Sequence, residues 1–181
     1  MADFMAEITR LGDAAVTIPI AAVLFAVLLA GARPGAAWRW SAAVAACGVV
    51  TAAGKLGLAA WGDGLAGLFS PSGHTASGVL VYGAMALLAR HRVAWLLAAC
   101  LAGLIAASRV YLHVHTPADV MAGLLVGAGS LACFVPGRPA LAGRVLRAGG
   151  AACVAVCCVS LAWHWSLPID PWLRAAAARL G

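Results

Sequence analysis

The sequence has little charge. Only 10% of its 181 residues are Asp, Glu, Lys or Arg, whereas 64% are hydrophobic, and the mean hydropathy is +0.98. Water-soluble domains carry about 25% charged residues, and a chain of this length could not hide so many apolar side chains from water. The composition therefore excludes an ordinary soluble domain and predicts a single, all-α integral membrane domain over residues 1–181.

The sequence also lacks the usual pattern of a metal site. No two of its cysteines form a C-x-x-C pair with flanking histidines, which argues against bound zinc. All six lie within apolar segments, where free cysteine behaves as a small apolar residue: Cys47, Cys100, Cys133, Cys153, Cys157 and Cys158. We expect these side chains in the core or facing lipid.

Two further absences concern the distribution of charge. The net charge is +6, but the arginines lie at the ends of apolar runs and form no basic stripe, so nucleic acid is not an expected partner. The N-terminus lacks the basic region of a signal peptide, because Asp3, Glu7 and Asp13 accompany Arg10. The first apolar run, Ala14–Ala32, ends in a sequence that resembles a cleavage site, but we interpret it as a mature helix.

Apolar runs long enough to cross a bilayer are abundant, since a spanning helix needs about 20 residues. Dividing the chain at its charges, with Gly and Pro at several joins, yields six candidate spans: Ala14–Ala32, Trp40–Trp61, Gly73–Ala89, Val93–Ser108, Pro117–Pro136 and Ala148–Leu167. The predicted fold is a six-span transmembrane helical bundle, in which small Ala and Gly side chains permit close packing.

Basic and aromatic residues suggest an orientation for this bundle. Seven of the twelve Lys and Arg fall on one side of the spans: Arg33, Arg39, Arg90, Arg92, Arg138, Arg144 and Arg147. The other side holds Arg10, Lys55, Arg109, Arg174 and Arg179. Because positive loops stay in the cytoplasm, the second side is predicted to face the exterior. Interfacial aromatic belts are expected from Trp38 and Trp40 on one side and from Trp61, Trp163, Trp165 and Trp172 on the other.

Ionisable residues near membrane depth are costly and mark functional sites. They occur near the end of the second span (Lys55), at the start of the third (Ser70–Thr75) and between the fourth and fifth (Ser108–Asp119). A chain that leaves one face in the third span returns to it in the fourth, so the three segments share one side of the bilayer. The sequence therefore predicts an active site at the outer membrane–water interface.

The residue types in these segments suit a phosphate. Lys55 and Arg109 can neutralise its charge, Arg109 through two parallel hydrogen bonds. Ser72, Gly73 and His74 stand at a predicted helix N-terminus, where free N–H groups and the helix dipole favour an anion. Gly73 has no side chain to block the approach of phosphate oxygens.

A nucleophile is indicated by the fourth connection. Thr116 and Pro117 predict a helix start, with Asp119 in its first turn. His115 and Asp119 are four residues apart, the spacing of neighbours on one helix face. An aspartate there can hold one imidazole nitrogen and leave the other nucleophilic.

Each residue also has a purely structural interpretation. Lys55 can extend its amine to the interface, the Ser-Gly-His segment can be a helix cap with an interfacial histidine, and Asp119 can be a first-turn cap. We interpret the other histidines, His91, His113 and His164, as interfacial, with His113 at most supporting the site. The occurrence of so many polar residues on one face favours catalysis.

The same residues carry a resemblance to a known family. Pro71-Ser72-Gly73-His74, followed by Ser108-Arg109, five residues, His115, three residues and Asp119, resembles the second and third signature motifs of the type 2 phosphatidic acid phosphatase superfamily. That family includes bacterial lipid phosphate and undecaprenyl diphosphate phosphatases, with soluble vanadium haloperoxidases as relatives. The resemblance implies a membrane phosphatase whose substrate is a lipid phosphate.

The resemblance also implies roles for single residues. His115 would attack phosphorus and form a phosphohistidine, with Asp119 orienting it. His74 would protonate the leaving lipid oxygen and then activate water. Phosphate oxygens would be held by the remaining residues, among which Lys55 corresponds to the lysine of the first motif: Lys55, Ser72, Gly73 and Arg109. No metal or other cofactor is needed in this scheme, because cationic side chains replace it.

The first motif departs from the family pattern. The family has Lys, six residues, then Arg-Pro, and counting from Lys55 these places hold Gly62 and Asp63. One phosphate-binding arginine is therefore missing, a loss of about 1.5–3 kcal/mol, or roughly ten- to a hundredfold in rate. We expect Asp63 to face water, because it would repel a phosphate.

Three functions remain open at the level of sequence. The leading one is a phosphomonoesterase or diphosphatase acting on a lipid in a bacterial inner membrane. The missing arginine favours an alternative, a catalytically impaired protein of the same fold that binds or transports a lipid phosphate. A structural bundle or small channel leaves the matched spacings unexplained. The sequence identifies neither the lipid nor the oligomeric state.

Overall fold

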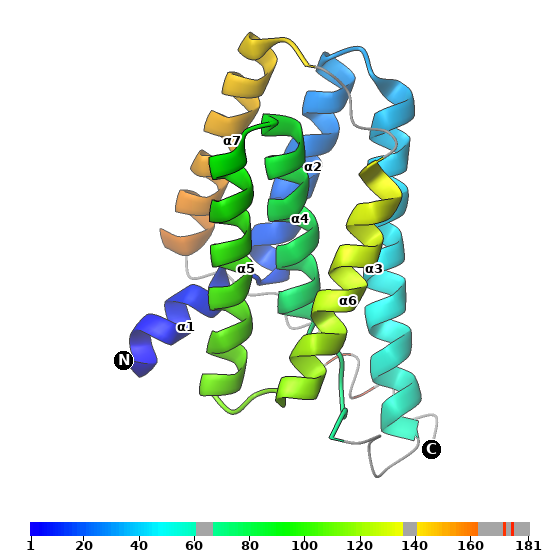
Figure 1. Cartoon of the computed structure of the whole chain (residues 1–181), viewed down its shortest axis with the longest axis vertical. Helices are drawn as coiled ribbons and strands as arrows, with labels where there is room; N and C mark the ends of the chain where they lie inside the picture. Colours follow the sequence, from blue (N-terminus) through cyan, green and yellow to red (C-terminus); the bar gives the residue numbers. More distant parts are fainter. Residues whose placement is uncertain (61–66, 136–140, 163–171, 173–174, 176–181) are drawn as a thin grey trace.

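The computed structural model describes residues 1–60, 67–135, 141–162, 172 and 175, and this part of the chain consists of helices and their connections (Figure 1). Six long apolar helices form a bundle, as predicted, and a short helix precedes them. They are α1 (Ala2–Arg10), α2 (Ala14–Ala30), α3 (Pro34–Ala60), α4 (Gly73–Ala89), α5 (Arg92–Tyr111), α6 (Pro117–Phe134) and α7 (Gly143–Ala162). The helix α1 was not among the predicted elements.

Most of the bundle can cross a membrane by length and composition. Five stretches qualify: Ala2–Ala30, which joins α1 and α2, then Pro34–Ala60, Arg92–Tyr111, Pro117–Phe134 and Gly143–Ala162. The remaining predicted span, α4, is apolar but has only 17 residues, or about 25 Å at 1.5 Å per residue. The chain is therefore a multi-pass membrane protein.

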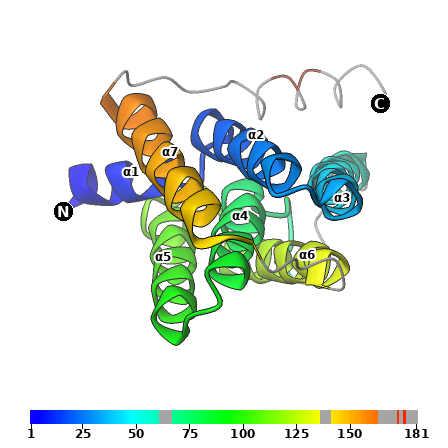
Figure 2. The ribbon, with the colours of Figure 1, turned by 90° about the horizontal axis from the view of Figure 1, so that it is seen from above.

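The helix α4 lies at the centre of the bundle. It packs against α2, α3, α5 and α6, and the view along the bundle shows it enclosed by these neighbours (Figure 2). Eleven of its residues are buried, so α4 is surrounded mainly by other helices. The outer helices, in contrast, face lipid. The polar residues at its N-terminus are consequently surrounded by the ends of neighbouring helices.

Local chemistry explains where the helices begin. The side chains of Asp13, Ser72 and Thr116 accept backbone N–H groups at the starts of α2, α4 and α6, which satisfies donors that lack a partner within the helix. Thr116 and Asp119 form a reciprocal capping box. The helix start predicted at Thr116–Pro117 is thus confirmed.

Two glycines let α6 approach α4 closely. A Cβ on Gly123 would lie 2.5 Å from the carbonyl oxygen of Ser72, and one on Gly127 would lie 2.5 Å from that of Ala76. Small residues one turn apart are a common means of bringing membrane helices into backbone contact. This contact fixes the first turns of α4 and α6 side by side.

One aromatic prediction is wrong. Trp40 is not an interfacial residue: it is 1% exposed, donates its indole N–H to the carbonyl oxygen of Ala21 at 2.8 Å and packs edge-on against Phe134. Burial is possible because the indole has a hydrogen-bond acceptor inside the bundle. Trp38 and Trp172 are 69% and 63% exposed. The other predicted belt residues, Trp61, Trp163 and Trp165, lie outside the described residues.

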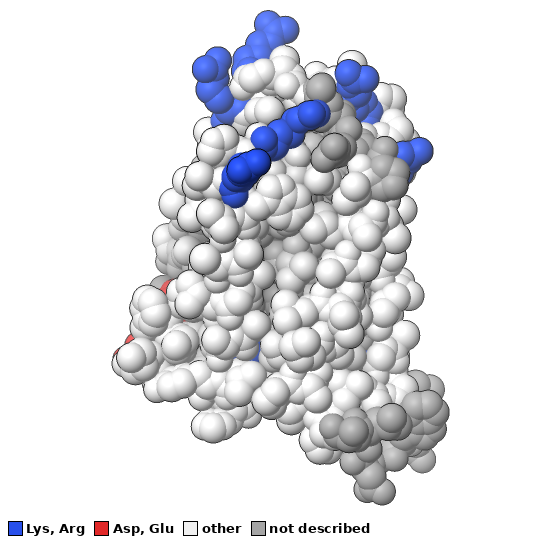
Figure 3. Space-filling model, viewed as in Figure 1, with Lys and Arg blue, Asp and Glu red and all other residues white. Residues whose placement is uncertain are grey.

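The two ends of the bundle differ in charge. Lys and Arg side chains gather at the upper end in Figure 3, where α2 joins α3, α4 joins α5 and α7 begins. The described arginines of these segments are Arg33, Arg39, Arg90, Arg92, Arg144 and Arg147. The opposite end carries α1 and the first turns of α4 and α6. The predicted segregation of basic residues is therefore present in the folded chain, although Arg138, Arg174 and Arg179 lie outside the described residues.

Candidate active site

All the predicted site residues belong to the end of the bundle opposite the one where most arginines gather. Four helix ends meet there: the last turns of α3 and α5 and the first turns of α4 and α6. They carry Lys55, Ser72, Gly73, His74, Arg109, His115 and Asp119. The predicted sharing of one face by these segments follows directly from the antiparallel order of the helices.

Asp119 is the most connected side chain of this region. Its Oδ1 accepts the backbone N–H groups of Phe69 at 2.8 Å and Ser70 at 2.7 Å, and its Oδ2 accepts that of Thr116 at 3.1 Å. Oδ2 also lies 3.2 Å from Nδ1 of His115. The carboxylate therefore attaches the segment before α4 to the start of α6 while it contacts the imidazole.

The side chain of His115 is buried beside Asp119. It is 6% exposed, and Nδ1 contacts Asp119, which leaves Nε2 as the imidazole nitrogen that does not face this carboxylate. Burial lowers the pKa of His115 below its usual range, and the positive charges of Arg109 and Lys55 lower it further, whereas the hydrogen bond to Asp119 raises it. A lowered pKa keeps the imidazole neutral at neutral pH, with its lone pair available.

The start of α4 is loosely packed around Gly73. A Cβ on Gly73 would meet only Cγ2 of Thr51, at an ordinary 3.6 Å, so packing within the described residues does not require glycine there. The side chain of Ser72 is fully buried, and its Oγ accepts the Thr75 hydroxyl at 3.0 Å. Ser72 therefore caps α4, and its predicted contact with phosphate stays a prediction.

Lys55 reaches the site from α3. Thr51, one turn earlier on this helix, is the neighbour of Gly73, and residues four apart share a helix face. A Cβ on Gly54 would lie 2.9 Å from Pro71 Cγ, so α3 contacts the segment that leads into α4. These contacts place Lys55, which is partly exposed, beside the N-terminus of α4.

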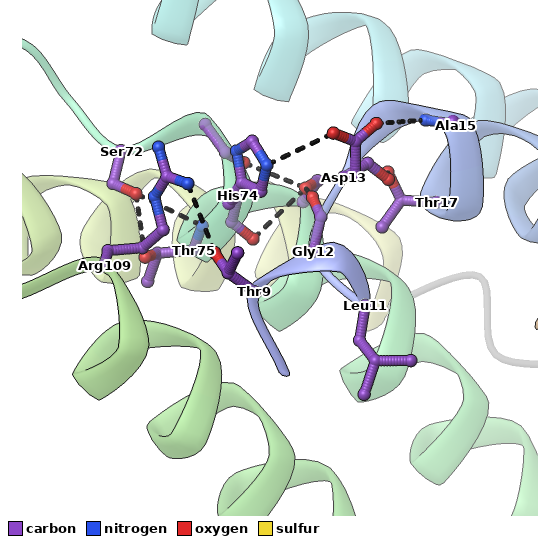
Figure 4. Close-up of polar contacts among 12 residues, drawn as sticks. Thr9, Leu11, Gly12, Asp13, Ala15, Thr17, Ser72, His74, Thr75 and Arg109 are labelled. Carbon is purple, nitrogen blue, oxygen red and sulfur yellow. Dashed lines mark hydrogen bonds and ion pairs between the residues drawn. The ribbon is translucent and has the colours of Figure 1, made fainter. Parts of the chain in front are cut away.

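Two site contacts come from the N-terminal segment and were missed by the sequence analysis. Arg109, which is 8% exposed, donates from Nη1 to the Thr9 hydroxyl at 3.2 Å, and Nε2 of His74 lies 3.4 Å from Oδ2 of Asp13 (Figure 4). From the sequence, Asp13 is only one of the acidic residues that argue against a signal peptide. Its position before an apolar run is typical of a helix cap, but no local pattern predicts contact with His74.

The remaining histidines have other surroundings. His113 is exposed and has a φ of 54°, and His91 caps α5 by accepting the N–H of Val93 at 3.2 Å. His164 lies outside the described residues, as do Gly62 and Asp63 of the incomplete first motif. Among the described residues no group of three or more His, Cys, Asp or Glu could hold a metal ion.

The chain is similar in sequence to known proteins. The family model of the PAP2 superfamily matches residues 14–142. A protein of Klebsiella pneumoniae, described as an uncharacterized 22.5 kDa protein in the cps region, is 35% identical over 138 residues, which cover 71% of this chain and 66% of that protein. No solved structure matches the chain. The matched residues include every predicted site residue, and the chain belongs to the PAP2 superfamily, a family of phosphatase type.

Proposed function

We propose that the chain is an integral membrane phosphatase that hydrolyses a lipid phosphate monoester or diphosphate through a phosphohistidine intermediate. The observation that carries this proposal is the environment of His115: a buried imidazole whose Nδ1 faces Asp119 and whose pKa is lowered by burial and by two nearby cations. Binding a phosphate needs cations alone, whereas this arrangement prepares a nucleophile. The proposed domain extends over residues 1–181.

The first step transfers phosphorus to the enzyme. Nε2 of His115 donates its electron pair to phosphorus, the bond from phosphorus to the lipid oxygen breaks, and His74 gives a proton to that oxygen. Lys55, Arg109 and the N–H groups at the start of α4 stabilise the negative charge of the phosphoryl oxygens. With a diphosphate as substrate, the leaving group is the lipid monophosphate.

The second step restores the enzyme. Water attacks phosphorus while His74 accepts its proton, the phosphorus–nitrogen bond breaks, and its electron pair returns to Nε2 of His115. Inorganic phosphate is released. This scheme uses His74 first as an acid and then as a base, and it calls on no metal or organic cofactor.

The proposed location is a bacterial inner membrane, with the site facing the periplasm or exterior. The support is the arginine-rich opposite end of the bundle, which the positive-inside rule assigns to the cytoplasm. Labelling of intact spheroplasts with an impermeant maleimide tests this orientation. His113→Cys should react and Arg33→Cys should not, because both positions are exposed but lie at opposite ends; the reverse pattern would contradict it.

The activity is tested with the full chain in detergent and a panel of phosphatidic acid, phosphatidylglycerophosphate and isoprenoid diphosphates. Released phosphate should fall roughly 10⁴-fold or more in His115→Asn, as is usual when a nucleophile is removed. His113→Asn is a matched control, because this exposed position has a positive φ that asparagine tolerates. Vanadate, which imitates five-coordinate phosphorus, should inhibit. Equal release by His115→Asn and wild type would rule out the mechanism.

The alternative function is a lipid-phosphate binding or transport protein of the same fold. It is favoured by the absence of an arginine at the place of Gly62. Retained binding of a lipid phosphate by the wild type, with no release of phosphate and no phosphohistidine after an acid-free quench, would support this alternative.

A further inference from the structure

The connection between α1 and α2 is built into the active-site end of α4. Tyr82 donates its hydroxyl to the carbonyl oxygen of Leu11 at 2.7 Å, and Ser77 donates to that of Gly12 at 2.9 Å. A Cβ on Gly12 would lie 2.7 Å from the carbonyl oxygen of His74, so only glycine allows this approach. These contacts place the next residue, Asp13, beside the first turn of α4.

That residue, Asp13, uses its two carboxylate oxygens differently. Oδ1 accepts the N–H of Ala15 at 2.8 Å and caps α2, while Oδ2 faces Nε2 of His74 at 3.4 Å. The side chains of Asp13 and His74 are 14% and 21% exposed, so the contact is largely shielded from water. A helix cap needs only one side-chain acceptor, which serine, threonine or asparagine would supply equally well.

We propose that Asp13 is a positioning residue for His74, and that the N-terminal segment Thr9–Asp13 thereby completes the active site. The proposal rests on the proposed function, because it assigns Asp13 a part in the proton transfers of that reaction. In this role the carboxylate lies at ion-pair distance from Nε2, 3.4 Å away, and its negative charge favours a proton on that nitrogen and fixes the direction of the ring. Nδ1 then carries the proton that moves to the leaving oxygen and later receives the proton of water.

The contacts of the two imidazoles are complementary. At His115 the aspartate holds Nδ1 and Nε2 is the reactive nitrogen, whereas at His74 the aspartate holds Nε2. Within the described residues, Nδ1 of His74 has no hydrogen-bond partner. Each histidine thus presents one nitrogen for chemistry while a carboxylate orients the other.

The same segment also touches the phosphate-binding part of the site. Thr9 accepts a hydrogen bond from Arg109, so one short stretch of chain contacts both the proposed acid and a proposed phosphate ligand. Arg10 secures the segment on the other side by donating to the carbonyl oxygens of Ser160 at 3.2 Å and Leu161 at 2.7 Å near the end of α7. Three helices therefore hold the N-terminal segment in place.

A purely structural role for Asp13 makes a different prediction from a positioning role. An ion pair that only connects α2 to α4 would affect every substrate alike through the amount of folded protein. A carboxylate that orients the general acid matters most when the leaving group is a poor one. A lipid alkoxide needs a proton to leave, whereas nitrophenolate leaves readily without one.

The test therefore compares two leaving groups in single turnovers, with the full-length enzyme in detergent and in excess over substrate. Asp13→Asn keeps an oxygen to cap α2 and removes the carboxylate, and Asp13→Ser is a second variant that keeps the cap. Asp3→Asn is the control, because Asp3 is an exposed acid on α1. Phosphatidic acid and 4-nitrophenyl phosphate serve as substrates, and the released diacylglycerol or nitrophenolate is measured.

In both Asp13 variants we expect release of the lipid alcohol to fall about tenfold to a hundredfold, while release of nitrophenolate changes by less than about twofold. The expected rate of Asp13→Asn/His74→Ala on the lipid equals that of His74→Ala alone, because the carboxylate acts through the imidazole. Equal losses for both leaving groups, no loss for the lipid, or additive effects in the double variant would overturn the proposal.

Failure of the inference can be told apart from failure of the proposed function. Wild-type enzyme that releases phosphate through a phosphohistidine, with Asp13→Asn equally fast on the lipid, would overturn only the role of Asp13. Wild-type enzyme that forms no phosphohistidine would overturn both.

Discussion

The two histidines of the site are each paired with an aspartate, but the pairs are built from different parts of the chain. His115 and Asp119 are four residues apart at one helix start, with side chains only 6% and 4% exposed. His74 and Asp13 come from the starts of different helices, α4 and α2, and are more exposed. The local pair is embedded in backbone hydrogen bonds, whereas the distant pair is assembled by helix packing.

The two aspartates therefore differ in how many backbone groups they bind besides the histidine. Asp119 accepts three backbone N–H groups from two segments of the chain, so the same carboxylate orients His115 and holds the segment before α4. Asp13 caps one helix. Substitutions by asparagine should therefore separate the pairs by their effect on stability as well as on rate.

Among substitutions that separate the two pairs, the largest expected effect is that of Asp119→Asn. The backbone N–H groups bound to Asp119 now share two carboxylate oxygens, whereas asparagine offers one acceptor oxygen. Some of these donors therefore lose their partner, which lowers the free energy of unfolding by about 2–4 kcal/mol in total. Phosphate release should fall roughly 10³-fold or more, since a histidine without its carboxylate loses both tautomer and orientation. The measurements are kcat and thermal unfolding in detergent. An equally large loss of thermal stability in Asp13→Asn would contradict the claim that Asp119 contributes more to stability than Asp13.

A smaller effect is expected from Gly73→Ala, at the helix start that lies between the two pairs. A Cβ there meets only Thr51 at 3.6 Å, and alanine is favoured over glycine in a helix by up to about 1 kcal/mol. The folded state should be unchanged or slightly more stable, while kcat/KM falls about tenfold because the methyl group occupies the space of a phosphate oxygen. Gly129→Ala, with nothing within 4 Å of its Cβ, is the control. Unchanged activity in Gly73→Ala would remove the anion site from this helix end.

The smallest expected effect is a shift in the titration of His115. Its pKa lies below the ordinary value of about 6.5, because of burial and then the charges of Arg109 and Lys55. The neutral nucleophile is therefore present above that lowered pKa and is lost only as pH falls through it. Lys55→Met removes one positive charge and should move the titration to higher pH. The C2 proton resonance of His115, assigned with His115→Asn, reports this shift, and a move to lower pH would contradict it.

The sequence predicted which segments meet at the end of the bundle that carries the candidate site, because much of the arrangement is local. Spans could be recognised from apolar runs, and the motif from Pro71 to Asp119 supplied His74, Arg109, His115 and their spacing. The contact between His115 and Asp119 follows from their separation of four residues at a helix start. What could not be predicted was the burial of Trp40, the helix α1 and the contacts that Thr9 and Asp13 make, since each depends on which helix faces lie together.

By itself the amino-acid sequence determined the class of protein, the number of long helices, the gathering of most arginines at one end of the bundle, and the local pairing of His115 with Asp119. These properties follow from hydropathy and from residue spacing along a helix, which act over one or a few turns. Tertiary structure alone decided that α4 would be central and that Asp13 would meet His74. Such contacts depend on close packing, as where Gly12 approaches the carbonyl of His74 and Gly123 approaches that of Ser72, and packing joins residues that no periodic pattern connects.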